Sequence, residues 1–191
     1  MVRKWYMTHD TRNLTGKGTS MIIREIDEMV MPEVWKIWVR GLHDHPEAFG
    51  ATYEWAKGVT PEQSQELLRQ IRAGGGFMLG AFEVDVPVGM LHLNRPKGEK
   101  FEHKGHIGAV YVIPEHRGKG IATALILAAL EKAQLIAVLT IISLEVNAEN
   151  QAAIKVYEAC GFKAYGIEPK GLRVNGKDIA LMHMAYEVRR G

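Results

Sequence analysis

The chain has 191 residues, of which 47% are hydrophobic and 24% charged, and its formal net charge is +2. This apolar content offsets the entropy of folding, so the composition excludes a disordered or fibrous chain. No long basic run appears, which argues against a dedicated nucleic-acid binder. A single cysteine, Cys160, excludes an intramolecular disulfide and a cysteine-based zinc site, and it favours a reducing compartment.

The sequence disfavours a membrane-spanning segment and favours a single domain. The apolar stretches are far shorter than the roughly 20 residues that span a bilayer, and the first residues lack the apolar region of a secretory signal. Residues 1–20 are polar and unpatterned, so we expect a flexible extension there. Residues 21–191 are expected to form a single domain of a cytoplasmic protein that makes no membrane contact.

The first half of the domain is predicted to hold a strand, two helices and a hairpin. Hydrophobic periodicity separates strands from helices, and Gly, Pro and capping residues mark their ends. The expected elements are a strand over 21–26, a helix that begins near Met31 with Asp27 as its cap, a loop over 41–59, a helix from Thr60 to 73, and hairpin strands over 77–84 and 87–94.

The second half alternates strands and helices. The expected elements are a strand over 105–113, a helix over 121–134, a strand over 138–146, a helix over 150–159, and closing strands over 162–167 and 178–188. The strand–helix–strand unit predicts a right-handed parallel crossover, whereas the hairpin before it is antiparallel. The order therefore predicts a three-layer α/β (α+β) fold with a mixed sheet.

The turn over 114–122 carries the clearest chemical signal. It joins a strand to a helix, and Gly118 and Gly120 keep side chains away from its backbone. The helix start supplies free N–H groups and a positive dipole end, and Arg117 and Lys119 add positive charge. These features predict a phosphate or pyrophosphate site. The residues match neither a Walker A loop nor a dinucleotide fingerprint, and a glycine turn for close packing is the alternative.

A second cluster lies on the helix over 150–159. Asn150, Ala153, Tyr157 and Gly161 fall on one face at spacings of three and four, and the small Ala153 leaves room for a thin ligand. On the preceding strand, Glu145 points away from the face of the apolar residues on either side of it.

The pattern R-x-x-G-x-A at Arg117, Gly120 and Ala122, followed by N-x-x-A-x-x-x-Y-x-x-x-G-F over 150–162, resembles the GNAT superfamily of acetyl-CoA-dependent N-acetyltransferases. The order of elements over 21–188 is similar to that fold as well. The resemblance implies a mixed, mostly antiparallel sheet with a splayed parallel strand pair, flanked by helices. It also implies an enzyme that takes acetyl-CoA as its acetyl donor.

The resemblance assigns roles to individual residues. Val110 and Val112 would offer backbone groups to the pantetheine arm of the cofactor, and Asn150 would hydrogen-bond that arm. The residues implied to wrap the pyrophosphate are Arg117, Gly118, Lys119, Gly120, Ile121 and Ala122. Tyr157 matches the position of the acid that protonates the leaving thiolate, and a packed core aromatic is the alternative reading.

The implied reaction is acyl transfer from a thioester to an amine, which must first lose a proton. Glu145 is the first candidate for the base, because its position resembles the base of ribosomal-protein N-terminal acetyltransferases; a strand glutamate paired with a cation is the alternative. Glu54 is the second candidate, or a ligand of the substrate ammonium, and water is the third. The histidine pairs at 43 and 45 and at 103 and 106 lack a third ligand, so no metal site is predicted.

The acceptor stays open among several classes. We expect the amine of a small molecule, with a protein N-terminus or lysine as the alternative. Three irregular segments are expected to set its pocket: the loop over 41–59, the charged segment over 95–104 and the hairpin region over 167–177. Trp35 and Trp38 are interpreted as core or acceptor-wall residues. A non-catalytic sensor that binds acyl-CoA is the alternative of another class. The expected partners are acetyl-CoA and an amine, with the chain as monomer or homodimer.

Overall fold

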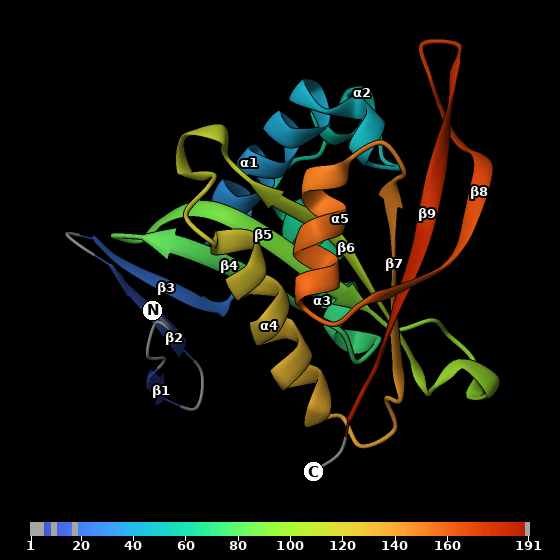
Figure 1. Ribbon diagram of the computed structural model, residues 1–191. Coiled ribbons are helices and arrows are strands. Elements are labelled where there is room, and N and C mark those ends of the chain that lie inside the picture. The colour runs from blue at the N-terminus through green and yellow to red at the C-terminus, as the bar shows by residue number, and fades with distance from the viewer. Residues whose placement is uncertain (1–5, 9–10, 17–18, 190–191) are drawn as a thin grey trace.

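The computed structural model describes residues 6–8, 11–16 and 19–189. Within these ranges the chain forms a nine-stranded sheet with helices on both faces (Figure 1). The strands, in their spatial order, are β1 (Tyr6–Thr8), β2 (Thr11–Gly16), β3 (Thr19–Glu25), β4 (Phe77–Glu83), β5 (Val86–Asn94), β6 (Lys104–Val112), β7 (Ile141–Asn147), β9 (Lys177–Glu187) and β8 (Lys163–Val174).

The helices form two layers around this sheet. They are α1 (Met31–Asp44), α2 (Tyr53–Ala56), α3 (Pro61–Ala73), α4 (Ile121–Gln134) and α5 (Gln151–Ala159), with single 3₁₀ turns η1 (Pro46–Ala48), η2 (Glu99–Phe101) and η3 (Pro114–His116). In the described ranges no helix combines the length and apolarity needed to cross a bilayer. The strands pair antiparallel except β6 and β7, which are parallel. The predicted mixed, mostly antiparallel sheet between helices is confirmed.

Two apolar cores lie on the two faces of the sheet. Leu125 of α4 and Ile154 of α5 belong to a core that also takes in Leu144 of β7, whereas Trp35 of α1 and Leu68 of α3 belong to the other. Along β7 the residues on either side of Leu144 are less buried, since successive side chains of a strand point to opposite faces. The same alternation turns Glu145 away from α4 and α5.

Helix α1 continues four residues into the stretch that the sequence predicted as a loop over 41–59. Its apolar face is extended by Leu42, which is buried, and Gly41 packs against the ring of Tyr111. A Cβ on Gly41 would lie 2.9 Å from that ring, so glycine lets the helix approach β6. The rest of the stretch is also partly regular, because it contains η1 and α2.

The predicted extension over residues 1–20 contains strands where the structure describes it. There β1 and β2 pair antiparallel and continue the sheet through β3, which starts at Thr19 and not at Met21. The other residues of this stretch lie outside the described residues, and the division of the chain at residue 20 stays a prediction. At the other end of the chain, β8 and β9 pair antiparallel up to the turn at Asn175–Gly176, and the register shifts between Ala164 and Gly166 and between Glu168 and Leu172.

Helix α3 begins with a capping box formed by Thr60 and Gln63. The Thr60 side chain accepts a hydrogen bond from the Gln63 amide at 3.3 Å, and the Gln63 side chain accepts one from the Thr60 amide at 2.8 Å. Thr60→Ala is expected to lower the free energy of unfolding by about 1 kcal/mol, because one N–H of the first turn loses its partner. Urea unfolding measures this, and Thr60→Ser, which keeps the oxygen, is the control. Equal losses in both variants would contradict the capping role.

Candidate active site

The parallel strands β6 and β7 stay paired only near their starts. The register joins Lys104 to Ile141 and ends at the pair His106 and Ser143, although the strands continue to Val112 and Asn147. Beyond that point no further β6–β7 pairs occur among the described residues. The strands therefore splay apart, as the resemblance to the GNAT superfamily implied, and the ends of β6 and β7 are not paired with each other.

A β-bulge lies where the strands part. The register of β6 against β5 shifts between Met90 and His92, so that β6 carries an additional residue at this point. Ala109 there has φ 52°, a left-handed conformation that residues other than glycine rarely adopt. Such strain costs on the order of 1–3 kcal/mol and gathers at functional sites. The bulge separates two cavities, since Ala109 lines one and Val110 lines the other.

The first cavity, of about 430 Å³, is lined by most of the residues that the sequence assigned to the cofactor, and it is called the cofactor cleft below. It lies between the end of β6, the turn η1, the loop into α4, and α5. Its lining includes these residues from the predicted set: Val110, Val112, Arg117, Gly118, Gly120, Ile121, Ala122, Asn150 and Tyr157. Lys119 and Glu145, also predicted, are not among the described residues that line it.

The loop into α4 has the geometry of an anion site. Gly118 and Gly120 have φ 72° and 79°, and a Cβ at either position would meet no atom within 4 Å, so both face open space. Gly120 is also the N-cap of α4 and makes no side-chain cap bond. The first-turn N–H groups of a helix have no partner within the helix, and they attract negative charge.

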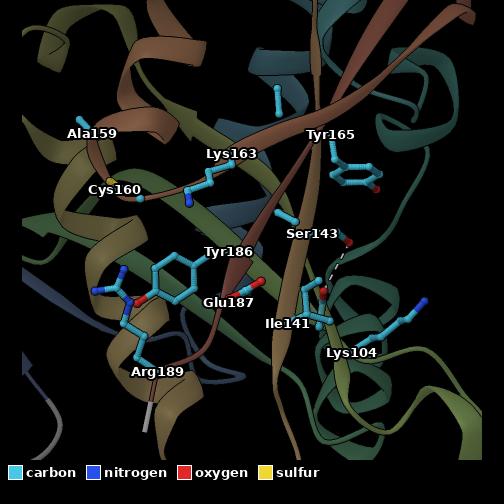
Figure 2. A pocket seen from close by; sticks show the side chains of 14 residues that line it. Lys104, Ile141, Ser143, Ala159, Cys160, Lys163, Tyr165, Tyr186, Glu187 and Arg189 are labelled. Atoms are coloured by element: carbon cyan, nitrogen blue, oxygen red, sulfur yellow. Dashed lines mark hydrogen bonds between the residues drawn. The ribbon is translucent and has the colours of Figure 1, made fainter. Parts of the chain in front are cut away.

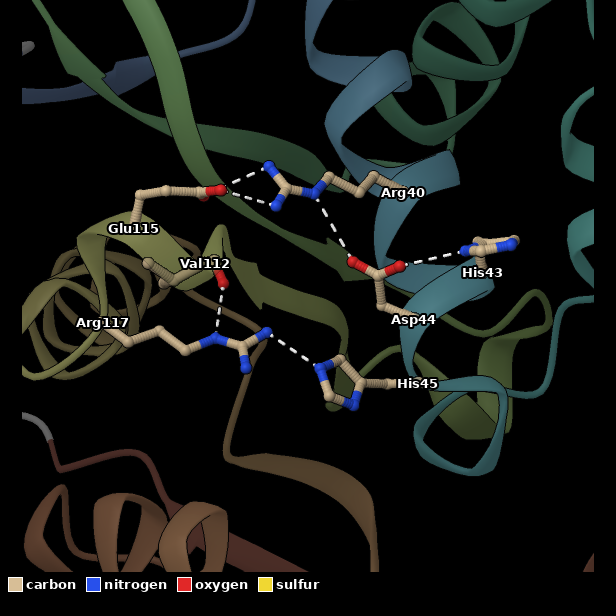
Figure 3. Close-up of polar contacts among 7 residues, drawn as sticks. All are labelled: Arg40, His43, Asp44, His45, Val112, Glu115 and Arg117. Carbon is tan, nitrogen blue, oxygen red and sulfur yellow. Dashed lines mark hydrogen bonds and ion pairs between the residues drawn. The ribbon is translucent and has the colours of Figure 1, made fainter.

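Arg117 ties this loop to the opposite wall of the cleft (Figure 3). Its Nε donates to the Val112 carbonyl at 3.0 Å, and its Nη2 donates to Nε2 of His45 at 3.1 Å. The guanidinium also lies 5.6 Å from the ring centre of Tyr111. The carbonyl of Val112 thus already accepts one hydrogen bond from the loop.

The side chains from α5 that face the cleft differ in their availability. Asn150 caps α5, because its Oδ1 accepts a hydrogen bond from the Ala153 amide at 3.0 Å, and this leaves its NH₂ group to donate elsewhere. Tyr157 is 8% exposed, and its ring packs edge-on against Phe162. Burial, with a smaller effect from Cys160, raises the pKa of Tyr157 well above its usual value. Its phenol therefore keeps its proton at neutral pH.

Glu145 lies in a chain of acids and imidazoles on the other face of the sheet. Its carboxylate is 3.3 Å from Nε2 of His106 on β6 and 3.6 Å from Nδ1 of His183 on β9. His183 in turn contacts Glu168 on β8 at 2.9 Å. The sequence analysis missed His183, because only the pairing of Glu145 with His183 across β7 and β9 brings them together. The described residues hold no cluster of three or more groups suited to a metal.

The second candidate base, Glu54, is placed differently. Its side chain is 75% exposed and forms an ion pair with Lys57 at 2.6 Å. It is absent from the lining of the cofactor cleft and of the neighbouring cavity in the described part of the chain.

The second cavity, of about 730 Å³, lies between α1, α3 and β5 on the Ala109 side of the bulge. Trp35, Trp38 and Trp55 line it, and so does His92, which the sequence analysis did not single out. Burial, helped by the charge of His106, lowers the pKa of His92 to about 4. The imidazole is therefore neutral at physiological pH.

A third cavity, of about 770 Å³, lies between β7, β8, β9 and the end of α5 (Figure 2). None of the predicted cofactor residues lines it within the described ranges. Cys160 does, and burial raises the pKa of its thiol to about 11. This thiol is therefore protonated and unreactive at neutral pH.

Comparison with known proteins agrees with this geometry. Residues 35–162 match the model of the acetyltransferase (GNAT) family. The spermidine N(1)-acetyltransferase of Vibrio cholerae is 36% identical over 84 residues, which are 43% of this chain and 49% of that protein. An N-alpha-acetyltransferase of Saccharolobus solfataricus is 38% identical over 79 residues, 41% of this chain and 47% of that one. The chain thus spans about half the length of these curated relatives.

Solved structures show the same fold over nearly the whole chain. A GNAT-family acetyltransferase from Streptococcus pneumoniae has a TM-score of 0.81 at 21% identity, covering 88% of this chain and 99% of that one. The putative acetyltransferase yncA from Salmonella typhimurium, solved with acetyl-CoA, has a TM-score of 0.80 at 19% identity, covering 90% and 95%. With the family match over 35–162, these likenesses identify the chain as a member of the acetyltransferase (GNAT) family.

Proposed function

We propose that this protein is a cytoplasmic enzyme that transfers the acetyl group of acetyl-CoA to a primary amine of a small molecule. The observation that carries the proposal is the cofactor cleft, where the loop into α4, the splayed end of β6 and α5 converge. An anion site at one end and a β-bulge at the other suit a long ligand with a phosphate head and a reactive tail.

The cleft residues would divide the cofactor between them. The amides around Gly118 and Gly120, with the charge of Arg117 and Lys119, would hold the pyrophosphate. The NH₂ group of Asn150 and backbone groups of β6 would hydrogen-bond the pantetheine arm. In this arrangement the thioester would lie beside the bulge. A strand N–H near Val112 would stabilise the oxyanion there and lower the barrier by about 3 kcal/mol.

In the transfer step the amine attacks the thioester directly. The neutral amine nitrogen forms a bond to the thioester carbon, the carbonyl π electrons move to the oxygen, and collapse of this tetrahedral species breaks the carbon–sulfur bond. The thiolate takes a proton from the hydroxyl of Tyr157, which burial keeps protonated, and the products are an amide and free coenzyme A. The proton that the amine loses would pass to Glu145 through water or the His106 imidazole beside it, because Glu145 lines neither the cofactor cleft nor the second cavity within the described residues.

The acceptor would approach from the cavity behind Ala109. Adjacent residues of β6 line this cavity and the cofactor cleft, so an amine there lies next to the expected position of the thioester. A recess of this size suits a small molecule. A protein N-terminus is the second candidate, because the relatives include an enzyme named N-alpha-acetyltransferase as well as one named for spermidine.

The test is thiol release by the purified protein with acetyl-CoA and a broad amine panel. The proposal expects at least one small amine to raise the release of free coenzyme A well above the rate without amine. If acetyl-CoA binds tightly and no amine, peptide N-terminus or lysine peptide raises thiol release, the chain is an acyl-CoA sensor. If only peptides do so, the acceptor class is wrong.

Glu145→Gln is expected to lower kcat/KM for the amine about ten-fold at pH 7, which is below the usual loss for a general base because His106 and His183 stay in place. The loss should shrink at pH 9 and above, where more of the amine is already neutral. A pH–rate profile measures both effects. Glu168→Gln, which changes the acid on the far side of His183, is the comparison. If both variants lose the same fraction of kcat/KM at every pH, Glu145 has no place in the proton path.

A further inference from the structure

The cavity behind Ala109 has an unusual wall of three tryptophans. The ring centres of Trp35 and Trp38 are 4.7 Å apart, and Trp55 lies 5.7 Å from Trp35 and 6.2 Å from Trp38, all in edge-to-face geometry. The Trp35 indole is fixed by a hydrogen bond from Nε1 to the Ala56 carbonyl at 3.0 Å. Trp55 is 50% exposed, so much of its ring is free for a ligand. Such a wall favours an apolar, flat body.

The charge on this cavity has one sign. Arg95 and Lys97 line it, and no aspartate or glutamate does within the described residues. His92 adds no charge, since its imidazole is neutral. A polycationic acceptor would meet two positive charges here with no carboxylate to offset them.

Arg95 has spare capacity for an anion. Its Nη2 donates to the Glu102 carbonyl at 3.0 Å, whereas its Nε is buried and has no hydrogen-bond partner in the described part of the chain. No ion pair joins its guanidinium to a carboxylate of the described residues. Gly75 accommodates the group, because a Cβ there would lie 2.6 Å from Nη1. A buried donor without a partner is costly, and the guanidinium, which lines the cavity, carries a charge that an anionic ligand would balance.

Arg95 is separated from the bulge along β5. The bulge faces Leu91 on β5, and Arg95 follows four residues later, about 13 Å along an extended strand. An arginine side chain and a ligand body with one aromatic ring together cover a separation of this order.

We propose that the acceptor is an amine with an aromatic or similarly flat apolar body and a carboxylate at the far end, held by Trp55 and Arg95. This rests on the proposed acetyltransferase function and specifies its substrate class. Trp55 and Arg95 then determine specificity: the indole contacts the body, and the guanidinium pairs with the carboxylate.

The experiment compares three amines with acetyl-CoA: 4-(aminomethyl)benzoate, benzylamine and spermidine. We expect kcat/KM to be about ten-fold higher for the carboxylate-bearing amine than for benzylamine, and lowest for spermidine. Arg95→Ala should abolish the preference between the two aromatic amines, and Arg95→Lys should keep part of it. Trp55→Ala should lower kcat/KM for both aromatic amines about ten-fold and leave the KM for acetyl-CoA unchanged. Phe101→Ala, at a residue of similar exposure (47%) outside this cavity, is the control.

The outcomes separate this inference from the function on which it rests. Preferred acetylation of spermidine, or an unchanged preference in both variants, would overturn the substrate class while the acetyltransferase function stands. If no amine releases thiol, the function fails, and a fluorescence titration with 4-(aminomethyl)benzoate still decides on the site. Quenching that Trp55→Ala and Arg95→Ala both weaken supports it, and no quenching of the wild type refutes it.

Discussion

Replacing Tyr157 with phenylalanine is expected to lower kcat about 100-fold and to leave the KM for acetyl-CoA nearly unchanged. The variant keeps the ring that packs against Phe162 and loses only the hydroxyl, so the fold and the cleft stay intact. The leaving thiolate then has no positioned proton donor, and an acid of this kind contributes on the order of 10²–10⁴ to the rate. Steady-state rates of thiol release with saturating amine measure the effect.

The raised pKa of Tyr157 sharpens this prediction. Because burial keeps the phenol protonated, the acid form is present throughout the neutral and mildly alkaline range. The factor by which Tyr157→Phe lowers kcat should therefore be independent of pH in that range. Tyr165→Phe is the matched control, since Tyr165 is 64% exposed and lies outside the cofactor cleft. A Tyr157→Phe enzyme with normal turnover would return this residue to its alternative reading, an aromatic packed in the core.

The cofactor cleft was predictable because its signals are local in sequence. The glycines of the loop into α4 set a backbone conformation, and the i, i+3 and i+4 spacing of Asn150, Ala153 and Tyr157 sets one helix face. Both motifs need only one strand–helix unit to come together. The nearby end of α1 was not predictable in the same way, since Gly41 reads as a helix stop until Tyr111 is seen beneath it.

The partners of Glu145 required knowledge of the sheet order. His106, Glu145 and His183 come from three strands that neighbour each other only in the folded chain, and β9 enters the sheet between β7 and β8. A one-residue change of register would turn the side chains of a strand to the opposite face. Periodicity gave the face of Glu145 but not what lies opposite it, so its contacts were beyond the sequence.

The sequence did not single out His92 either, because its surroundings also depend on the sheet. Its lowered pKa leads to a prediction about stability. Its imidazole is buried at the wall of the tryptophan-lined cavity, beside Gly108, where an added Cβ would lie 2.6 Å from Nε2. Burial lowers its pKa from 6.5 to about 4 in the folded chain. Between these values the unfolded chain binds more protons than the folded one, so acid favours unfolding. The stabilisation from the neutral imidazole is fully present above pH 6.5 and is lost as the pH falls toward 4.

We therefore expect the free energy of unfolding to fall by up to about 3 kcal/mol from this residue between pH 7 and pH 4. His92→Gln cannot take up a proton, so its unfolding free energy should depend less on pH over that window, even if the variant is less stable at pH 7. Urea unfolding at several pH values measures both curves, with His103→Gln, at an exposed histidine, as the control. Parallel curves for wild type and His92→Gln would show that the imidazole is not held neutral. His92 lies next to the bulge, where the amine is proposed to react, so its neutrality confines the positive charge of the cavity lining to Arg95 and Lys97, where the acceptor's carboxylate is proposed to bind.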